Sequence, residues 1–165
     1  MAKLAIKPGS TSVTVEVFIQ DSSVTTGAGL TGLAYNTASL TAYYKRNGNV
    51  APVAITLATL AAITTAWSSG GFIAADGTNT PGLYRLDIPD AALATGARSV
   101  IIYLKGATNM APCLLEIDLT NDANLVNILG TAVSTPATAG VLDVNIKKLN
   151  NTTLNGNGSS TPWGP

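Results

Sequence analysis

The sequence contains no histidine and a single cysteine, Cys113. The absence of histidine removes the commonest general base and metal ligand, and with it the Ser-His-Asp and Cys-His arrangements of nucleophilic catalysis. A zinc site would need more cysteine or histidine ligands, and one cysteine cannot form a disulfide within the chain. We therefore expect no enzymatic activity, no cofactor and no metal, and we interpret Cys113 as a small buried hydrophobic residue.

Charge is also scarce, because charged residues make up 11% of the chain, against about 25% in an average protein. Nine basic and nine acidic residues cancel, whereas a nucleic-acid-binding protein needs cations that neutralise phosphates. The only tight basic clusters are Lys45–Arg46 and Lys147–Lys148, which we interpret as solvated pairs. No run approaches the roughly 20 consecutive apolar residues of a membrane span, and the first residues do not resemble a signal peptide. We expect neither nucleic acid nor membrane as a partner.

Hydrophobic residues are plentiful at 46%, but aromatic residues reach only 5%, so the core must be built from Val, Ile, Leu and Ala. Residues 11–20 alternate strictly, with Val13, Val15, Val17 and Ile19 on one face and polar residues mostly on the other. This period of two predicts a half-buried strand.

Further short strands are expected along residues 1–120, separated by turn residues. Asn47-Gly48 predicts a hairpin, because both residue types tolerate positive φ. Residues 58–69 could form a short helix or a loop, and residues 91–95 a single helical turn with Asp90 as N-cap and Gly96 after its end. The strands are predicted at 38–46, 53–57, 72–75, 83–88, 99–105 and 112–120, with 1–10 as an extended arm or edge strand. This spacing predicts an all-β fold, an antiparallel β-sandwich of immunoglobulin-like or jelly-roll-like type.

The composition changes after residue 120. Residues 122–129 have the pattern of a short amphipathic helix, 131–140 read as a linker, and 141–154 as a strand-like stretch. Such isolated apolar rows cannot bury themselves, so we expect residues 121–165 to be an extended assembly segment that packs on other copies. Trp163, between prolines and glycine, is expected to anchor in a partner's pocket. The predicted assembly residues are Leu125, Ile128, Leu129, Leu142, Val144, Ile146, Leu149 and Trp163.

Two carboxylates, Asp87 and Asp90, flank Pro89 and could in principle form a glycosidase pair about 5 Å apart. The preferred interpretation is structural, with Asp87 facing solvent at a strand end and Asp90 capping a turn. The loop that begins at Asp76 has too few carboxylates for a calcium site and is interpreted as a plain turn.

Several segments resemble structural proteins of tailed phages and prophages. They are TNTPGLYRLDIPDAAL at residues 78–93, LTAYYKR at 40–46 followed by ITL at 55–57, and DVNIKKLNNTTLNGNG at 143–158 with the ending PWGP at 162–165. The resemblance implies a non-enzymatic virion protein that is assembled in the bacterial host cytoplasm, and it implies no catalytic residues.

Two functions are open within this class. The first is a capsid decoration or cement protein, or a short head fibre, which forms a homo-oligomer, expected to be a trimer, and binds the major capsid protein. The alternative is a tail-fibre or baseplate adaptor that binds a receptor or tail proteins. An exposed aromatic cluster, for example at Tyr35 or Tyr43–Tyr44, would favour the alternative.

Overall fold

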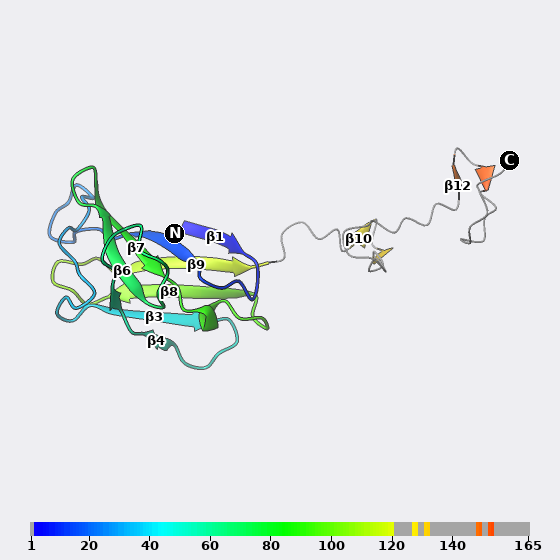
Figure 1. Ribbon diagram of the computed structural model, residues 1–165, viewed down its shortest axis with the longest axis horizontal. Coiled ribbons are helices and arrows are strands. Elements are labelled where there is room, and N and C mark those ends of the chain that lie inside the picture. Colours follow the sequence, from blue (N-terminus) through cyan, green and yellow to red (C-terminus); the bar gives the residue numbers. More distant parts are fainter. Residues whose placement is uncertain (1, 121–126, 129–130, 133–147, 150–151, 154–165) are drawn as a thin grey trace. The chain divides into compact units, whose positions relative to one another are not determined.

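The computed structural model describes residues 2–120 and four two-residue strands at 127–128, 131–132, 148–149 and 152–153 (Figure 1). The chain divides into two units, Met1–Ala123 and Asn124–Pro165. The first unit holds nine strands in two sheets that pack face to face, so the predicted β-sandwich is confirmed.

The two sheets contain five and four strands. Sheet A has the order β1-β9-β8-β3-β4, and sheet B the order β2-β7-β6-β5. The strands of sheet A are β1 (Ala2–Ile6), β3 (Thr41–Arg46), β4 (Val53–Ile55), β8 (Ser99–Lys105) and β9 (Cys113–Leu119). Those of sheet B are β2 (Thr14–Phe18), β5 (Ala58–Thr59), β6 (Gly71–Asp76) and β7 (Thr80–Asp87).

The strand order is that of an immunoglobulin-like sandwich rather than a jelly roll. The order β2-β7-β6 matches the B-E-D strands, and β9-β8-β3-β4 matches the G-F-C-C′ strands of the variable type. The pairing is antiparallel except at one edge of each sheet, where β1 runs parallel to β9 and β5 parallel to β6. Strand alternation alone could not predict these parallel edges, because it carries no information on strand direction.

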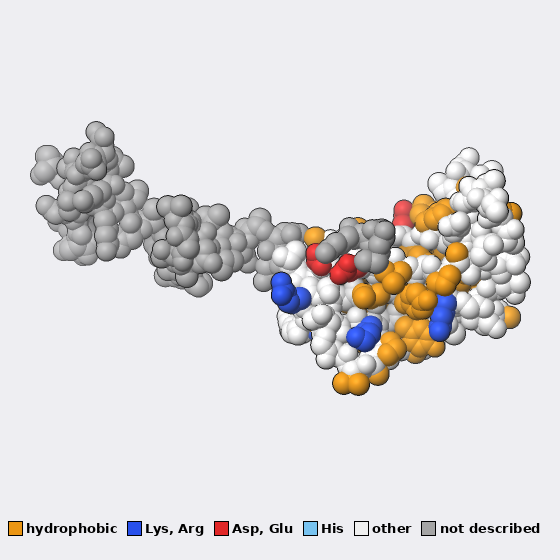
Figure 2. All heavy atoms as spheres, turned by 180° about the vertical axis from the view of Figure 1, so that it is seen from behind, with side chains coloured by type: hydrophobic (Ala, Val, Ile, Leu, Met, Phe, Trp, Pro, Cys, Tyr) orange, Lys and Arg blue, Asp and Glu red, His pale blue; other side chains and the backbone are white. Residues whose placement is uncertain are grey.

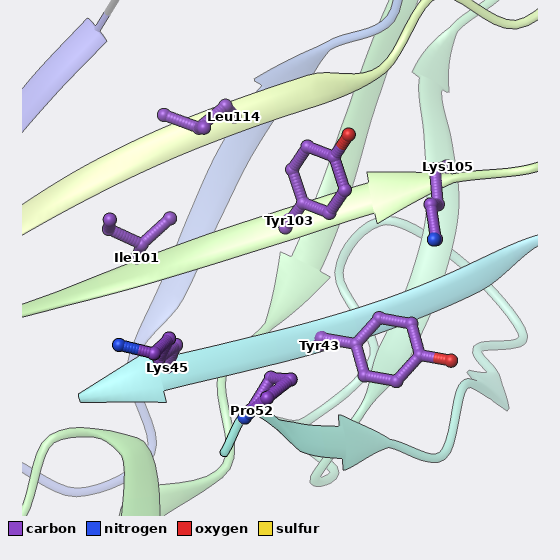
Figure 3. Close-up of a pocket in the computed structure, with 7 residues that line it drawn as sticks. All are labelled: Tyr43, Lys45, Pro52, Ile101, Tyr103, Lys105 and Leu114. Carbon is purple, nitrogen blue, oxygen red and sulfur yellow. The ribbon is translucent and has the colours of Figure 1, made fainter. Parts of the chain in front are cut away.

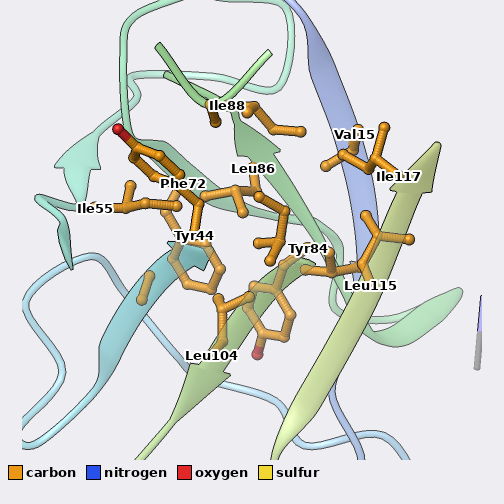
Figure 4. Close-up of a cluster of buried hydrophobic side chains, with 14 of the residues drawn as sticks. Val15, Tyr44, Ile55, Phe72, Tyr84, Leu86, Ile88, Leu104, Leu115 and Ile117 are labelled. Atoms are coloured by element: carbon orange, nitrogen blue, oxygen red, sulfur yellow. The ribbon is translucent and has the colours of Figure 1, made fainter. Parts of the chain in front are cut away.

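The inner faces of both sheets meet in one hydrophobic core (Figure 4). Val15 and Val17 of β2 are buried, whereas Thr14, Glu16 and Phe18 are exposed, which confirms the predicted alternation. Phe72 and Tyr84 stack with ring centroids 5.0 Å apart. The buried Tyr84 hydroxyl donates a hydrogen bond to the Leu30 carbonyl at 2.7 Å, and this bond joins the loop before β3 to the core. The hydroxyl is therefore not left unpaired in the apolar interior.

Most predicted strands are confirmed, with small shifts in their ends. The predicted β3–β4 hairpin forms, and its connection extends over residues 47–52, between the predicted strands. Residues 58–69 contain the short strand β5 and then turns, so the loop alternative is right and the helix is not formed.

The predicted helical turn is shorter and begins earlier than expected. It is the 3-10 turn η1 (Asp90–Ala92), whose N-cap is Pro89 with no side-chain cap. The prediction that Asp90 caps this turn is therefore wrong. Its carboxylate instead accepts a hydrogen bond from the Ser12 amide at 2.8 Å, which ties the turn to the segment before β2.

In the second unit, β10 (Asn127–Ile128) pairs with β11 (Thr131–Ala132), and β12 (Lys148–Leu149) pairs with β13 (Thr152–Thr153). Residues 127–128 are thus extended, so the predicted helix over 122–129 is wrong at its C-terminal end. Ile128 and Thr131 are β-branched, and this residue type favours strands. The rest of that helix, the linker over 131–140 apart from β11, and the residues around β12 and β13 lie outside the described residues.

A loop and a strand of the first unit cross at a pair of glycines, Gly29 in the loop and Gly82 in β7. Gly82 has φ of +85°, a conformation that side chains with a Cβ rarely adopt. A Cβ placed on Gly29 would lie 2.0 Å from the Pro81 carbonyl oxygen, and one on Gly82 would lie 2.4 Å from the Gly29 Cα. The loop over residues 21–34 can therefore pack on the start of β7 only because both side chains are absent.

Gly29→Ala should lower the free energy of unfolding by about 2 kcal/mol or more, because backbone must move to admit the methyl group. Gly77→Ala is the matched control, since nothing lies within 4 Å of its Cβ position and its φ is not in the positive region. We expect the control to be neutral or slightly stabilising. Urea unfolding measures both, and equal effects of the two substitutions would contradict the close crossing.

Candidate functional site

The outer face of sheet A carries a row of apolar and aromatic side chains. Tyr43 of β3 pairs with Tyr103 of β8, and Tyr103 pairs with Leu114 of β9. Their chain neighbours Tyr44 and Ile102 are buried in the core. Because successive side chains of a strand point to opposite faces, the row of Tyr43, Tyr103 and Leu114 points away from the core.

The neighbouring row on the same face has a different character. Lys45 of β3 pairs with Ile101 of β8, and Ile101 pairs with Glu116 of β9. An apolar side chain therefore lies between a cation and an anion, each on a strand that flanks β8.

Side chains of both rows, all but Glu116, surround an open hollow of about 510 Å³ (Figure 3). They come from three adjacent strands and from the residue that precedes β4. The hollow is lined by Tyr43, Lys45, Pro52, Ile101, Tyr103, Lys105 and Leu114.

The apolar row continues at both ends into smaller hollows. Tyr43 also lines a hollow of about 240 Å³ that includes Tyr35, and Leu114 also lines one of about 450 Å³ that includes Phe18. Phe18 is 50% exposed and Tyr35 is 40% exposed. We call this continuous surface, made of Phe18, Leu114, Tyr103, Tyr43 and Tyr35, the aromatic band.

The aromatic band takes up four of the nine aromatic residues of the chain. Three others, Tyr44, Phe72 and Tyr84, are buried in the core. A chain with so few aromatic residues therefore places many of them outside its core. Exposure of aromatic surface to water is unfavourable in free energy, and such surface is typical of sites that bind a partner.

The charges on this face are divided. Figure 2 shows hydrophobic side chains gathered on this side of the molecule, with basic side chains beside them and acidic side chains along their upper border. The basic residues at the hollow are Lys45 and Lys105, and the acidic residues are Glu116 and Asp118 of β9. Lys3 of β1 is the register partner of Glu116. The division into a basic side and an acidic side around an apolar centre therefore holds for the three central strands β3, β8 and β9.

The outer face of sheet B holds a buried ion pair between Arg85 and Asp87. The prediction that Asp87 faces solvent is therefore wrong. Asp87 is fully buried and Arg85 is 6% exposed. The Arg85 Nε donates to Asp87 Oδ1 at 2.9 Å and its Nη2 to Oδ2 at 3.0 Å. The Thr14 hydroxyl and the Ser68 amide complete the shell of the carboxylate, at 2.8 and 2.9 Å.

The loop between β5 and β6 covers this ion pair. Arg85 Nη1 donates to the carbonyl oxygens of Ile63 and Thr65, and the Trp67 indole donates to the Val13 carbonyl at 3.2 Å. The alternation correctly placed Arg85 and Asp87 on the outer face of β7. It could not show that a loop distant in sequence lies over that face.

Burial alone would raise the pKa of Asp87. The hydrogen bonds from Arg85, Ser68 and Thr14, together with the charge of Arg85, outweigh burial and hold the pKa below its ordinary value of 3.8. The carboxylate is therefore ionised in the folded protein and serves to anchor the loop. Its interactions are structural, as expected, although the predicted exposure was not found.

The remaining candidate groups have local explanations. The Asp76 carboxylate accepts hydrogen bonds from the Asn79 side chain at 2.6 Å and the Thr78 amide at 2.8 Å, which lower its pKa and form the predicted plain turn. Cys113 is partly buried against the core, and burial raises the pKa of its thiol. Arg46 is not simply solvated as predicted, because its guanidinium donates to the Ala94 and Thr95 carbonyls at 2.6 Å.

Among the residues that the structure describes, no group of three or more His, Cys, Asp or Glu side chains could hold a metal ion. No helix within the same residues is long and apolar enough to span a membrane.

Of the predicted assembly residues, Ile128 lies in β10 and Leu149 in β12. The other six, Leu125, Leu129, Leu142, Val144, Ile146 and Trp163, lie outside the described residues. The aromatic band was not among the predicted assembly residues, although Tyr35 and Tyr43 had been named as possible members of an exposed aromatic cluster. Its main component, the pairing of Tyr43 with Tyr103, depends on strand register between segments 60 residues apart, and only the outward position of Tyr43 could be read from alternation.

Comparison of the chain with family models, with curated proteins and with solved structures gave no match. The features of this surface therefore carry the functional argument.

Asp87→Asn should lower the free energy of unfolding by about 3 kcal/mol at neutral pH, because the buried Arg85 loses its counter-ion. Asp76→Asn is the matched control, since Asp76 is exposed and asparagine can keep its turn, and it should cost less than about 1 kcal/mol. Urea unfolding of the two variants and the wild type measures both effects.

The pH dependence of this difference has a defined sign. A carboxylate with a lowered folded-state pKa stabilises the protein above its unfolded pKa, and the stabilisation is lost as pH falls through the folded-state pKa. The stability difference between the wild type and Asp87→Asn should therefore shrink below pH 3.8. A difference that is small at neutral pH, or that grows in acid, would contradict the role of the ion pair.

Proposed function

We propose that this protein is a non-enzymatic structural protein of a tailed-phage particle, a capsid decoration or cement protein or a short head fibre. Its sandwich contacts neighbouring proteins of the particle through the aromatic band on sheet A, and the assembled protein docks on the major capsid protein. The protein is made in the bacterial host cytoplasm and acts in the virion.

The observation that carries this proposal is the aromatic band. The centre of the band, Tyr43, Tyr103 and Leu114, stands on strands of sheet A whose opposite face is the packed core, so this part of the surface is held rigid before any partner binds. A preformed surface loses little conformational entropy on binding. Large aromatic side chains contribute much of the energy of protein contacts.

The rest of the sandwich supports a scaffold role. Its buried ion pair anchors a loop through Arg85 Nη1 and Asp87 Oδ2, and its tyrosine hydroxyl in the core joins another loop to the sheet. These interactions stabilise a rigid unit that presents a surface. The neutral net charge of the whole chain suits a protein that spends its life within an assembly.

The proposal also assigns a role to residues 121–165. We propose that this segment holds copies of the chain together, in a trimer, through its apolar residues and Trp163. The sandwiches would then be presented side by side, and several weak contacts to the shell would add up to stable attachment.

A second candidate is a tail-fibre or baseplate adaptor that binds a receptor or another tail protein. The outward cluster of Tyr43 with Tyr103, and the exposed Tyr35, favour this candidate, because tyrosine rings also bind diverse ligands. Tyr44 does not contribute, since it is buried in the core.

Quantitative mass spectrometry of purified phage particles distinguishes the two candidates. A decoration protein should be present in a copy number comparable with that of the major capsid protein, because it covers repeated sites on the shell. A tail component should be present in far fewer copies, in proportion to the tail proteins. Absence of the protein from purified particles would refute both.

A chain truncated after Thr120 tests the role of the C-terminal segment. It should keep the unfolding free energy of the full chain, because the described core lies entirely within residues 2–120. Its molar mass by light scattering should fall by a factor of three beyond the loss of the residues themselves. Three-fold association that survives in the truncated chain would contradict the assembly role of this segment.

A further inference from the structure

The two rows on the outer face of sheet A are arranged symmetrically about β8. Strand β8 is the central strand of sheet A, with β9 on one side and β3 on the other. In one row, Ile101 of β8 lies between Lys45 of β3 and Glu116 of β9. The positive charge of Lys45 and the negative charge of Glu116 thus lie on opposite sides of β8, one strand away from it and at the same level along it.

We propose that this face binds the same face of a second copy of the chain. The two-fold axis runs parallel to β8 and lies between sheet A of one copy and sheet A of the other. The inference rests on the proposed role of the aromatic band as a contact surface, and it names the partner. A two-fold contact uses the same patch on both molecules, so the patch must be complementary to itself.

The charges satisfy this condition. A two-fold axis along β8 places β3 of one copy over β9 of the other. Lys45 of each copy then faces Glu116 of its partner copy, and two ion pairs form around the apolar centre. Like charges in these positions would repel, so the arrangement selects this one alignment of the faces.

The apolar row satisfies the condition as well. The same axis places Tyr43 over Leu114 of the second copy, and Tyr103 over the Tyr103 of the second copy. Sheets that pack face to face lie about 10 Å apart with strands within about 30° of alignment, which leaves room for one interdigitated layer of side chains. That layer would fill the hollow of about 510 Å³ on each copy.

Lys105 does not disturb this arrangement. It is the last residue of β8, it is exposed, and it lies beyond Tyr103 at the border of the hollow. A long lysine side chain at such a border can keep its ammonium group in water. The contact therefore has an apolar centre, two ion pairs and a solvated rim, as protein interfaces commonly do.

Charge reversal in the full-length chain tests the proposal. Lys45→Glu and Glu116→Lys each replace both ion pairs by pairs of like charge. Each variant alone should raise the dissociation constant of the two-fold contact by about tenfold or more, measured by sedimentation equilibrium. At protein concentrations between the dissociation constants of the wild type and the variant, the molar mass of the variant should be half that of the wild type. The variant is then a monomer where the wild type is a dimer, or a trimer where the wild type is a hexamer. Lys7→Glu, which changes charge at an exposed residue outside sheet A, should have no effect.

Mixing the two single variants in equal amounts gives the sharpest result. In a mixed pair, the two substituted residues face each other with opposite charges, and the native Glu116 of one chain faces the native Lys45 of the other. Both ion pairs are therefore restored, and at one of them the two charges have changed places. The mixture should associate as the wild type does, and so should the double variant Lys45→Glu/Glu116→Lys.

A wild-type chain that shows no two-fold association at high concentration, or variants that associate unchanged, would overturn the proposal, as would a mixture that fails to associate. Binding of a different protein or a glycan to this face of a monomeric chain would also overturn it. The test uses purified protein alone, so its failure leaves the location in the virion untouched. Conversely, absence of the protein from phage particles would refute the proposed function and leave the two-fold contact standing.

Discussion

The register of β8 between β3 and β9 is the constraint on which the rest of the structure depends. It places Ile102 and Leu104 in the core, and because side chains alternate, it also fixes Ile101 and Tyr103 on the outer face. A slip of one residue would exchange the two sets and expose the core. The same hydrogen-bonded ladder that secures the fold therefore aligns the rows of the contact surface.

The two sheets treat their outer faces differently. Sheet B covers its outer face with the loop over residues 60–70, which the buried pair of Arg85 and Asp87 holds in place. Sheet A has no comparable cover over the aromatic band among the described residues, and its tyrosines remain partly exposed. A sandwich that seals one face with its own loop and leaves aromatic side chains on the other is suited to packing that second face on a partner.

Much of the sandwich could be predicted from sequence, because strands with one buried face carry their own pattern. The alternation in residues 11–20 identified β2 directly, and the strand predicted at residues 99–105 is β8. Strand direction and order could not be predicted in this way, since they depend on how segments far apart in the chain meet. The burial of Asp87 was missed for the same reason, as it is caused by a loop that alternation does not describe.

The candidate site was the least predictable part. The predicted assembly residues all lie beyond residue 120. They were chosen because the apolar residues there are too few and too scattered to bury one another. Tyr35 and Tyr43 had been named as possible members of an exposed aromatic cluster, but Phe18, Tyr103 and Leu114 gave no such signal, because apolar residues in strands are common both in cores and on surfaces. Only the pairing of Tyr43 with Tyr103 and Leu114 shows that they form one surface.

The central claim is that the aromatic band is covered when the protein assembles. Hydroxyl-radical footprinting of the full chain at low and high protein concentration tests it most directly, with Trp67 as an internal reference on sheet B. The account predicts that oxidation of Tyr43 and Tyr103 falls as the protein associates while oxidation of Trp67 is unchanged. Equal oxidation of the two tyrosines in the dissociated and associated protein would contradict it.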